Sequence, residues 1–197
     1  MVSAAPAATP SATSESVQGP SVVGVGTVVW LSSELMFFAG LFAAYFTLRA
    51  ATNAWPPPGT ELATARTGAA TVVLIASSYT MHLAVRASES DDRQRAVQWL
   101  VVTMGLGLVF LSNQAVEYRE LKFTISSHAY GSMFYLMTGF HGMHVIGGIV
   151  FMAAVIGVIA GRSSRAPSGQ TVAVCSYYWH FVDVVWVAMF TTLYLLR

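Results

Sequence analysis

The sequence YYWHFVDVVW at residues 177–186 decides the fold class, because it places an acid in the middle of an apolar segment. That segment covers residues 171–196, and Asp183 is its only charged residue. A helix of about 20 residues crosses a hydrocarbon core of ~30 Å. An acid at its midpoint costs roughly 2.5–3.5 kcal/mol, so other protein must surround it. His180 lies one helical turn earlier, on the same helix face as Asp183.

Composition extends this interpretation to the whole chain. Of its 197 residues, 55% are hydrophobic and 10% are charged, against about 25% charged in an average soluble domain. Five segments carry at most one charged residue each, at about 22–48, 67–87, 96–116, 129–161 and 171–196. The sequence therefore predicts an all-α integral membrane protein, a bundle of five transmembrane helices over residues 22–197. Residues 1–21, rich in Ala, Ser, Thr and Pro, are expected to form a disordered tail.

Charge and cysteine content exclude several classes of function. A net charge of +1 argues against a nucleic-acid partner, which requires a basic patch. The single cysteine, Cys175, excludes an internal disulfide and any site that needs a thiolate pair. Lys and Arg divide equally between the two ends of the predicted spans, so the positive-inside rule gives no orientation.

The positions of proline and of small residues indicate whether the predicted helices are continuous and how they pack. All seven prolines lie outside the predicted spans, which predicts unbroken helices and argues against a transporter built on interrupted helices. Small residues recur at helix-packing spacing, and two explanations are open: packing within this chain, which is the commoner case, or docking to another membrane subunit. These residues are Ala39, Gly40, Ala43 and Ala44 in the first span and Ala153, Gly157 and Gly161 in the fourth.

Five ionisable groups on three spans share one approximate depth near mid-membrane, namely Glu34, His141, His144, His180 and Asp183. A structural network of hydrogen bonds between helices is the favoured explanation. A carboxylate–histidine metal site is an alternative, although bundles of that kind use four acids and this layer has two. Bis-histidine haem ligation and a proton relay are further alternatives.

Other polar residues receive simpler interpretations. His82 is expected at a membrane interface, and His128 is expected in a loop or at a helix cap. Glu117 belongs to the short charged sequence EYRE, which is interpreted as an ordinary boundary at the end of the third span. Replacing Asp183 with Ala is expected to leave His180 without a partner, at a cost of about 1–3 kcal/mol.

With these motifs in order, the chain closely resembles subunit III of the haem–copper cytochrome c oxidases. The resemblance covers about residues 22–197, and several blocks in the correct order are more specific than any single motif. The matching blocks are SELMFFAG at 33–40, WPP at 55–57, QAVEY at 114–118, FTIS at 123–126, YGSMF at 130–134, TGFHGMHV at 138–145 and YWHFVDVVW at 178–186.

The resemblance implies a subunit of a proton-pumping oxidase that has no catalytic centre, haem or copper of its own. In the family, the redox chemistry belongs to subunits I and II. Subunit III packs against subunit I, holds phospholipid, and sustains proton uptake and turnover stability. Glu34 matches the family's buried membrane glutamate, and the other four mid-depth residues match its internal polar residues. The implied location is the bacterial plasma membrane, with a cytoplasmic N-terminus and an external C-terminus.

One departure from the family pattern concerns helix number. Many family members have seven helices, and two of them form a wall of the lipid cleft that five helices would lack. Five-helix forms include oxidases that associate with a cytochrome bc complex in a supercomplex. Subunit III of a quinol oxidase, or an accessory protein of nitric oxide reductase, is the alternative within the same fold. An independent haem or metal membrane enzyme is the alternative from another class.

Overall fold

The computed structural model describes residues 22–161 and 169–196, and every regular element in these ranges is helical. The predicted tail at residues 1–21 lies outside the described residues. Five helices are long and apolar enough to cross a membrane, which confirms the predicted fold class. They are α1 (Val22–Ala50), α2 (Thr64–Glu89), α3 (Arg93–Glu120), α4 (Ala129–Ala160) and α5 (Gly169–Phe190), and α5 continues into a π-helical turn, η1 (Thr191–Leu195).

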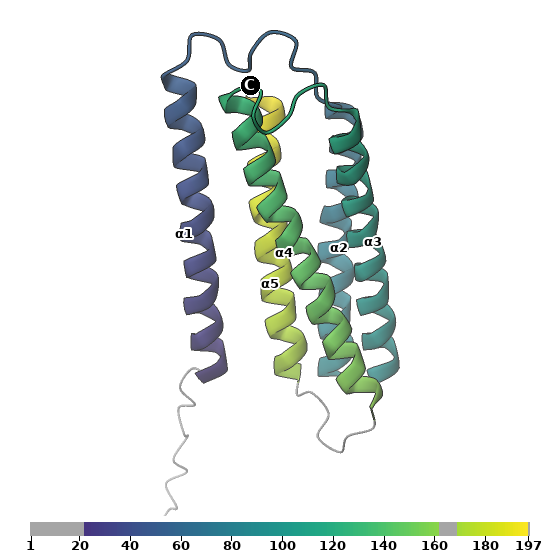
Figure 1. The fold of residues 1–197 in the computed structure, drawn as a ribbon. Coiled ribbons are helices and arrows are strands. Elements are labelled where there is room, and N and C mark those ends of the chain that lie inside the picture. Colours follow the sequence, from purple (N-terminus) through teal and green to yellow (C-terminus); the bar gives the residue numbers. More distant parts are fainter. Residues whose placement is uncertain (1–21, 162–168, 197) are drawn as a thin grey trace, which may run out of the picture.

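The helices form a bundle in which α1 stands at one edge (Figure 1). The hairpin of α2 and α3 lies at the other edge, and α4 and α5 occupy the middle. Helix α2 packs against α3 and α5, whereas α1 packs against α4 and α5. Four helices extend two to four residues beyond a predicted span at one or both ends, because polar residues such as Arg93 and Glu120 extend the helix toward water.

Two helix starts are capped by side chains next to charged or polar loops. Asp92 Oδ1 accepts a hydrogen bond from the Arg95 backbone N–H at 3.0 Å, at the start of α3. His128 Nδ1 accepts from the Gly131 backbone N–H at 2.8 Å, at the start of α4. The prediction that His128 is a cap residue is confirmed. Both bonds satisfy amide groups that have no partner within the first turn of a helix.

Glycine allows a close approach between helices where α5 meets α3 and α4. The indole ring of Trp179 is fully buried, and a Cβ atom at Gly148 would lie 2.7 Å from it. A Cβ atom at Gly107 would lie 2.8 Å from the same ring. The Trp179 indole N–H donates to Ser77 Oγ of α2 at 2.9 Å. One side chain of α5 therefore holds three other helices in register.

The stripes of small residues on α1 and α4 do not pack against any other part of the described chain, residues 22–161 and 169–196. Ala39, Gly40, Ala43 and Ala44 are all exposed, and a Cβ atom at Gly40 would meet nothing within 4 Å. On α4, Ala153, Gly157 and Gly161 are exposed as well. Packing within the described chain is therefore the wrong explanation for both stripes. Their surfaces face outward.

The last turn of the fifth span departs from the expected unbroken α-helix. Residues Thr191–Leu195 wind as a π-helix, although no proline is near. Tyr45 of α1 donates its hydroxyl to the Thr192 carbonyl at 3.2 Å, and Tyr130 of α4 donates to the Leu193 carbonyl at 2.9 Å. These two bonds occupy carbonyls at the end of the span and attach that end to two other helices.

Candidate functional site

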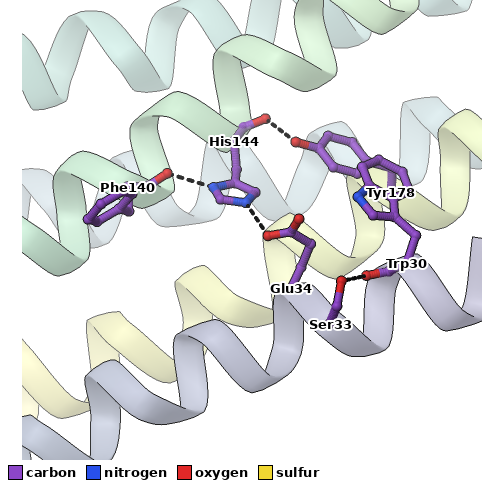
Figure 2. A network of polar contacts seen from close by, with 6 residues as sticks. All are labelled: Trp30, Ser33, Glu34, Phe140, His144 and Tyr178. Carbon is purple, nitrogen blue, oxygen red and sulfur yellow. Dashed lines mark hydrogen bonds and ion pairs between the residues drawn. The ribbon is translucent and has the colours of Figure 1, made fainter.

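The first pair of mid-depth groups joins α1 to α4. Glu34 Oε2 lies 3.1 Å from His144 Nε2, and His144 Nδ1 lies 2.7 Å from the Phe140 carbonyl oxygen (Figure 2). A carbonyl oxygen only accepts hydrogen bonds, so Nδ1 carries a hydrogen. One further proton must lie between Nε2 and Oε2, because two lone pairs would repel each other there. The Glu34–His144 pair is electrically neutral whichever atom holds that proton.

Aromatic residues complete this junction. Tyr178 of α5 donates its hydroxyl to the His144 carbonyl at 3.0 Å, and Trp30 of α1 stacks on the Tyr178 ring with centroids 5.1 Å apart (Figure 2). Phe38 meets the His144 imidazole edge-on at 5.1 Å. The pair is only partly sheltered, since 28% of the Glu34 side chain and 17% of the His144 side chain are exposed. Three helices therefore meet at one polar contact that reaches the surface of the bundle.

The second group joins α5 to α2 through a serine. Ser78 Oγ of α2 contacts His180 Nδ1 at 3.0 Å and donates a hydrogen bond to Asp183 Oδ2. A hydroxyl has one hydrogen and two lone pairs, so Ser78 can accept from the imidazole and donate to the carboxylate at once. Asp183 is 5% exposed, and its Oδ1 atom has no hydrogen-bond partner among the described residues.

This geometry corrects the expectation for the Asp183→Ala variant. The His180 imidazole contacts Ser78 and does not depend on Asp183 for a partner. The expectation that the substitution leaves His180 unpartnered is therefore wrong. Sequence spacing placed the two residues on one face of α5, but it could not show that a serine of α2 lies between them.

The fifth residue, His141, is separate from both groups. Its side chain is 1% exposed and lies between the rings of Phe110 and Trp186, with centroids 5.8 and 5.0 Å away. Neither ring nitrogen has a hydrogen-bond partner in the described part of the chain. The structure thus divides the five predicted residues into two pairs and one isolated imidazole. Within the described ranges, no three His, Cys, Asp or Glu side chains gather as a candidate metal site.

A further junction, around Glu117, was missed in the sequence. Glu117 is 1% exposed, and its Oε2 atom accepts hydrogen bonds from Thr67 of α2 at 3.0 Å and from Tyr194 of η1 at 2.9 Å. The interpretation of this residue as an ordinary charged boundary is wrong, because α2 and the end of the fifth span cover it. Its neighbour Glu120 is the boundary residue, exposed and paired with Arg66 at 2.6 Å.

The seam between α2 and α5 contains more bonds of the same kind. Besides the Ser77–Trp179 bond, the Trp186 indole N–H donates to Thr71 Oγ1 at 2.9 Å. Serine and threonine in membrane helices often bond a carbonyl of their own helix, as Thr71 does with Thr67. Their presence in a span therefore gives no sequence signal for a bond to another helix.

These features define a polytopic helical-bundle membrane protein whose helices are joined by hydrogen bonds between polar side chains. The comparison with known sequences is more specific. The family described as cytochrome c oxidase subunit III matches residues 12–197. The chain belongs to this family, and it is a subunit III component of a haem–copper oxidase complex.

Individual relatives support the same assignment. A protein of Mycobacterium tuberculosis named probable cytochrome c oxidase subunit 3 is 51% identical over 187 residues, which cover 92% of each chain. Cytochrome c oxidase subunit 3 of Corynebacterium diphtheriae is 43% identical over 185 residues and 90% of each chain. The protein of the same name from Thermostichus vulcanus is 41% identical over 177 residues, 87% of this chain and 86% of the relative.

Proposed function

We propose that this chain is a non-catalytic core subunit of a proton-pumping cytochrome c oxidase in aerobic respiration. In this proposal haem and copper reside in subunits I and II, and this chain packs against subunit I. The names of the relatives support cytochrome c as the electron donor. The proposed location is the bacterial plasma membrane, with the N-terminus in the cytoplasm and the C-terminus outside.

The observation that carries the proposal is the pairing of mid-depth ionisable groups across helices. Glu34 pairs with His144 between α1 and α4, and Asp183 bonds Ser78 between α5 and α2. Groups that are occupied in this way stabilise the relative positions of helices. A rigid bundle would support the partner subunit that holds the metal centres, and so sustain proton uptake and turnover.

Exposed surfaces support the packing part of the proposal. The small residues of α1 and α4 face outward, and such residues let another helix approach closely in a membrane. Glu34 is partly exposed beside His144, which also fits contact with a phospholipid at this position. We further propose that the oxidase associates with a cytochrome bc complex in a supercomplex. The outward-facing surfaces of α1 and α4 are available for such a contact.

The experiment compares the oxidase purified with this chain and the oxidase purified from a deletion strain, with purified chain added back as the control. The expected result is that the deletion complex keeps its haem spectrum and its initial oxygen consumption with cytochrome c, but inactivates after fewer turnovers. Add-back should restore the turnover lifetime. An unchanged lifetime would contradict the proposal, and activity with quinol alone would favour the quinol oxidase alternative.

A further inference from the structure

Three ionisable side chains lie at increasing depth along the seam between α2 and α5. The end of α2 and the start of α5 lie side by side, since a Cβ atom at Gly169 would lie 3.9 Å from Glu89 Cγ. With a rise of 1.5 Å per residue, His82 of α2 lies about 10 Å from this end of the bundle, His180 about 16 Å and Asp183 about 21 Å. Series of histidines and acids within membrane helices are typical of proton paths.

The outer two residues of this series are accessible, whereas the innermost one is enclosed. His82 is exposed and acts electrostatically on His180, which is itself partly exposed. Asp183 is 5% exposed, its Oδ1 atom is enclosed, and its Oδ2 atom is bonded to Ser78. The hydroxyl of Ser78 is therefore the group through which Asp183 most directly exchanges a proton.

This hydroxyl can carry a proton between Asp183 and His180. In one arrangement protonated Asp183 donates to Ser78, and Ser78 donates to His180 Nδ1. In the other, Ser78 has taken the Asp183 hydrogen and given its own to Nδ1, so that Asp183 is a carboxylate and His180 an imidazolium. An O–H bond breaks at Asp183, an N–H bond forms at His180, and the hydroxyl is regenerated. The imidazolium then releases a proton from Nε2, the nitrogen that is not bonded to Ser78.

The series ends at Asp183. Beyond it, the α5 residues described along the outer face of the seam are valine and alanine, which carry no proton. Ionisable residues of the neighbouring helices do not extend the series. Glu34 and His144 are paired with each other, and His141 lies between two aromatic rings. A path with one open end can store a proton without letting it cross the membrane.

We propose that Asp183 is a proton store in the middle of the membrane, and that it exchanges its proton through the Ser78 hydroxyl and His180. These three residues form the relay. Both arrangements of the loaded relay are electrically neutral, which avoids an uncompensated charge within hydrocarbon. The inference goes beyond the proposed function and concerns this chain alone, so it does not depend on assembly with an oxidase.

The proton exchange of Asp183 can be measured separately from that of other acids. The chain has three aspartates, and the other two, Asp91 and Asp92, lie between α2 and α3. Aspartate labelled with carbon-13 at the carboxyl carbon is incorporated into the full chain in phospholipid nanodiscs, and Asp183→Asn identifies the NMR signal of Asp183. The exchange rate is measured at the midpoint of its titration. We expect Ser78→Ala and His180→Asn each to slow the exchange about a hundredfold, the lower end of what a positioned acid–base group contributes.

Two further variants serve as matched controls. Ser78→Thr retains the hydroxyl and should exchange nearly as fast as the unmodified chain. Ser77→Ala removes the bond from Trp179 between the same two helices but leaves the relay intact, so it should not slow the exchange. Unchanged exchange in Ser78→Ala or in His180→Asn would overturn the inference, and so would equal slowing in Ser77→Ala.

A second measurement needs no substitution. Histidine labelled with nitrogen-15 reports the protonation of the His180 ring in the same sample. Because the relay shares one proton, the carboxyl signal of Asp183 should shift a second time in the pH range in which His180 titrates. A carboxyl signal that does not respond to the titration of His180 would overturn the inference, even if no relay variant folds.

Discussion

Helices α5 and α1 meet the rest of the bundle in different ways. In the span formed by α5 and η1, 56% of an apolar window of 18 residues is buried. In the corresponding window of α1, 11% is buried. Helix α5 bonds α2 through Ser77, Ser78 and Thr71, and its indole rings lie in the core. Helix α1 forms side-chain hydrogen bonds to other helices through Glu34 at its middle and Tyr45 near its end.

This difference separates stability within the chain from assembly with other chains. The seam of α2 and α5 is joined by hydrogen bonds between side chains of the two helices, so this part of the bundle is held together within the chain. Most of α1 is left for lipid or for other subunits to cover. Substitutions on the two helices should therefore have unequal effects on the folding of the chain.

The largest contrast is expected between two tryptophans. Trp179→Ala leaves a cavity beside Gly107 and Gly148 and should lower the free energy of unfolding by about 3 kcal/mol or more. Trp30→Ala on α1 removes one stacking contact of a residue that is 42% exposed and should cost about 1 kcal/mol. Unfolding in detergent micelles, followed by circular dichroism, measures both. Equal losses of unfolding free energy in the two variants would contradict the expected difference between α5 and α1.

A second contrast compares two glutamates near one end of α3. Glu117→Ala leaves the hydroxyls of Thr67 and Tyr194 without their acceptor, which should cost about 2–4 kcal/mol. Glu120→Ala removes an exposed ion pair with Arg66 and should cost about 0.5 kcal/mol or less. The same unfolding measurement applies. If Glu117→Ala lowers the free energy of unfolding no more than Glu120→Ala does, then Glu117 does not connect Thr67 and Tyr194 in the folded protein.

A third contrast uses serines of α2 and α1. Ser78→Ala removes the hydroxyl that bridges His180 and Asp183 and should cost about 1–2 kcal/mol. Ser33→Ala removes a bond to a carbonyl of its own helix at an exposed position, and we expect a change within about 0.5 kcal/mol. If both variants unfold alike, Ser78 does not connect the two helices.

The smallest effect is expected outside the membrane, where Lys122 pairs with Glu61 at 2.9 Å and both side chains are 77% exposed. The hydrogen bond and charge of Lys122 lower the pKa of Glu61. A contribution of this sign is present at neutral pH and is lost as pH falls through the lowered pKa. Lys122→Gln should raise the pKa of Glu61, measurable by NMR, with no detectable change in unfolding. A measurable loss of stability would mean that this loop contact matters to the fold.

The five helices could be predicted from the sequence because charged residues are almost absent from the spans and all prolines lie outside them. The contacts between helices could not be predicted from the sequence. Ser78 and Thr67 have the same sequence context as hydroxyl residues that bond their own helix, so their bonds across helices depend on packing. Glu117 resembles its neighbour Glu120 in sequence, and only the position of α2 and Tyr194 makes it buried. Small residues follow the same spacing whether they face inward or outward.

We propose that Glu34, His144 and Asp183 join helices of the bundle and that this chain holds no electron carrier. The most direct test separates the subunits of the purified oxidase and records the absorption spectrum and metal content of each fraction. We expect haem and copper to remain with the partner subunits. A Soret band, or stoichiometric metal, in the fraction that contains only this chain would contradict it.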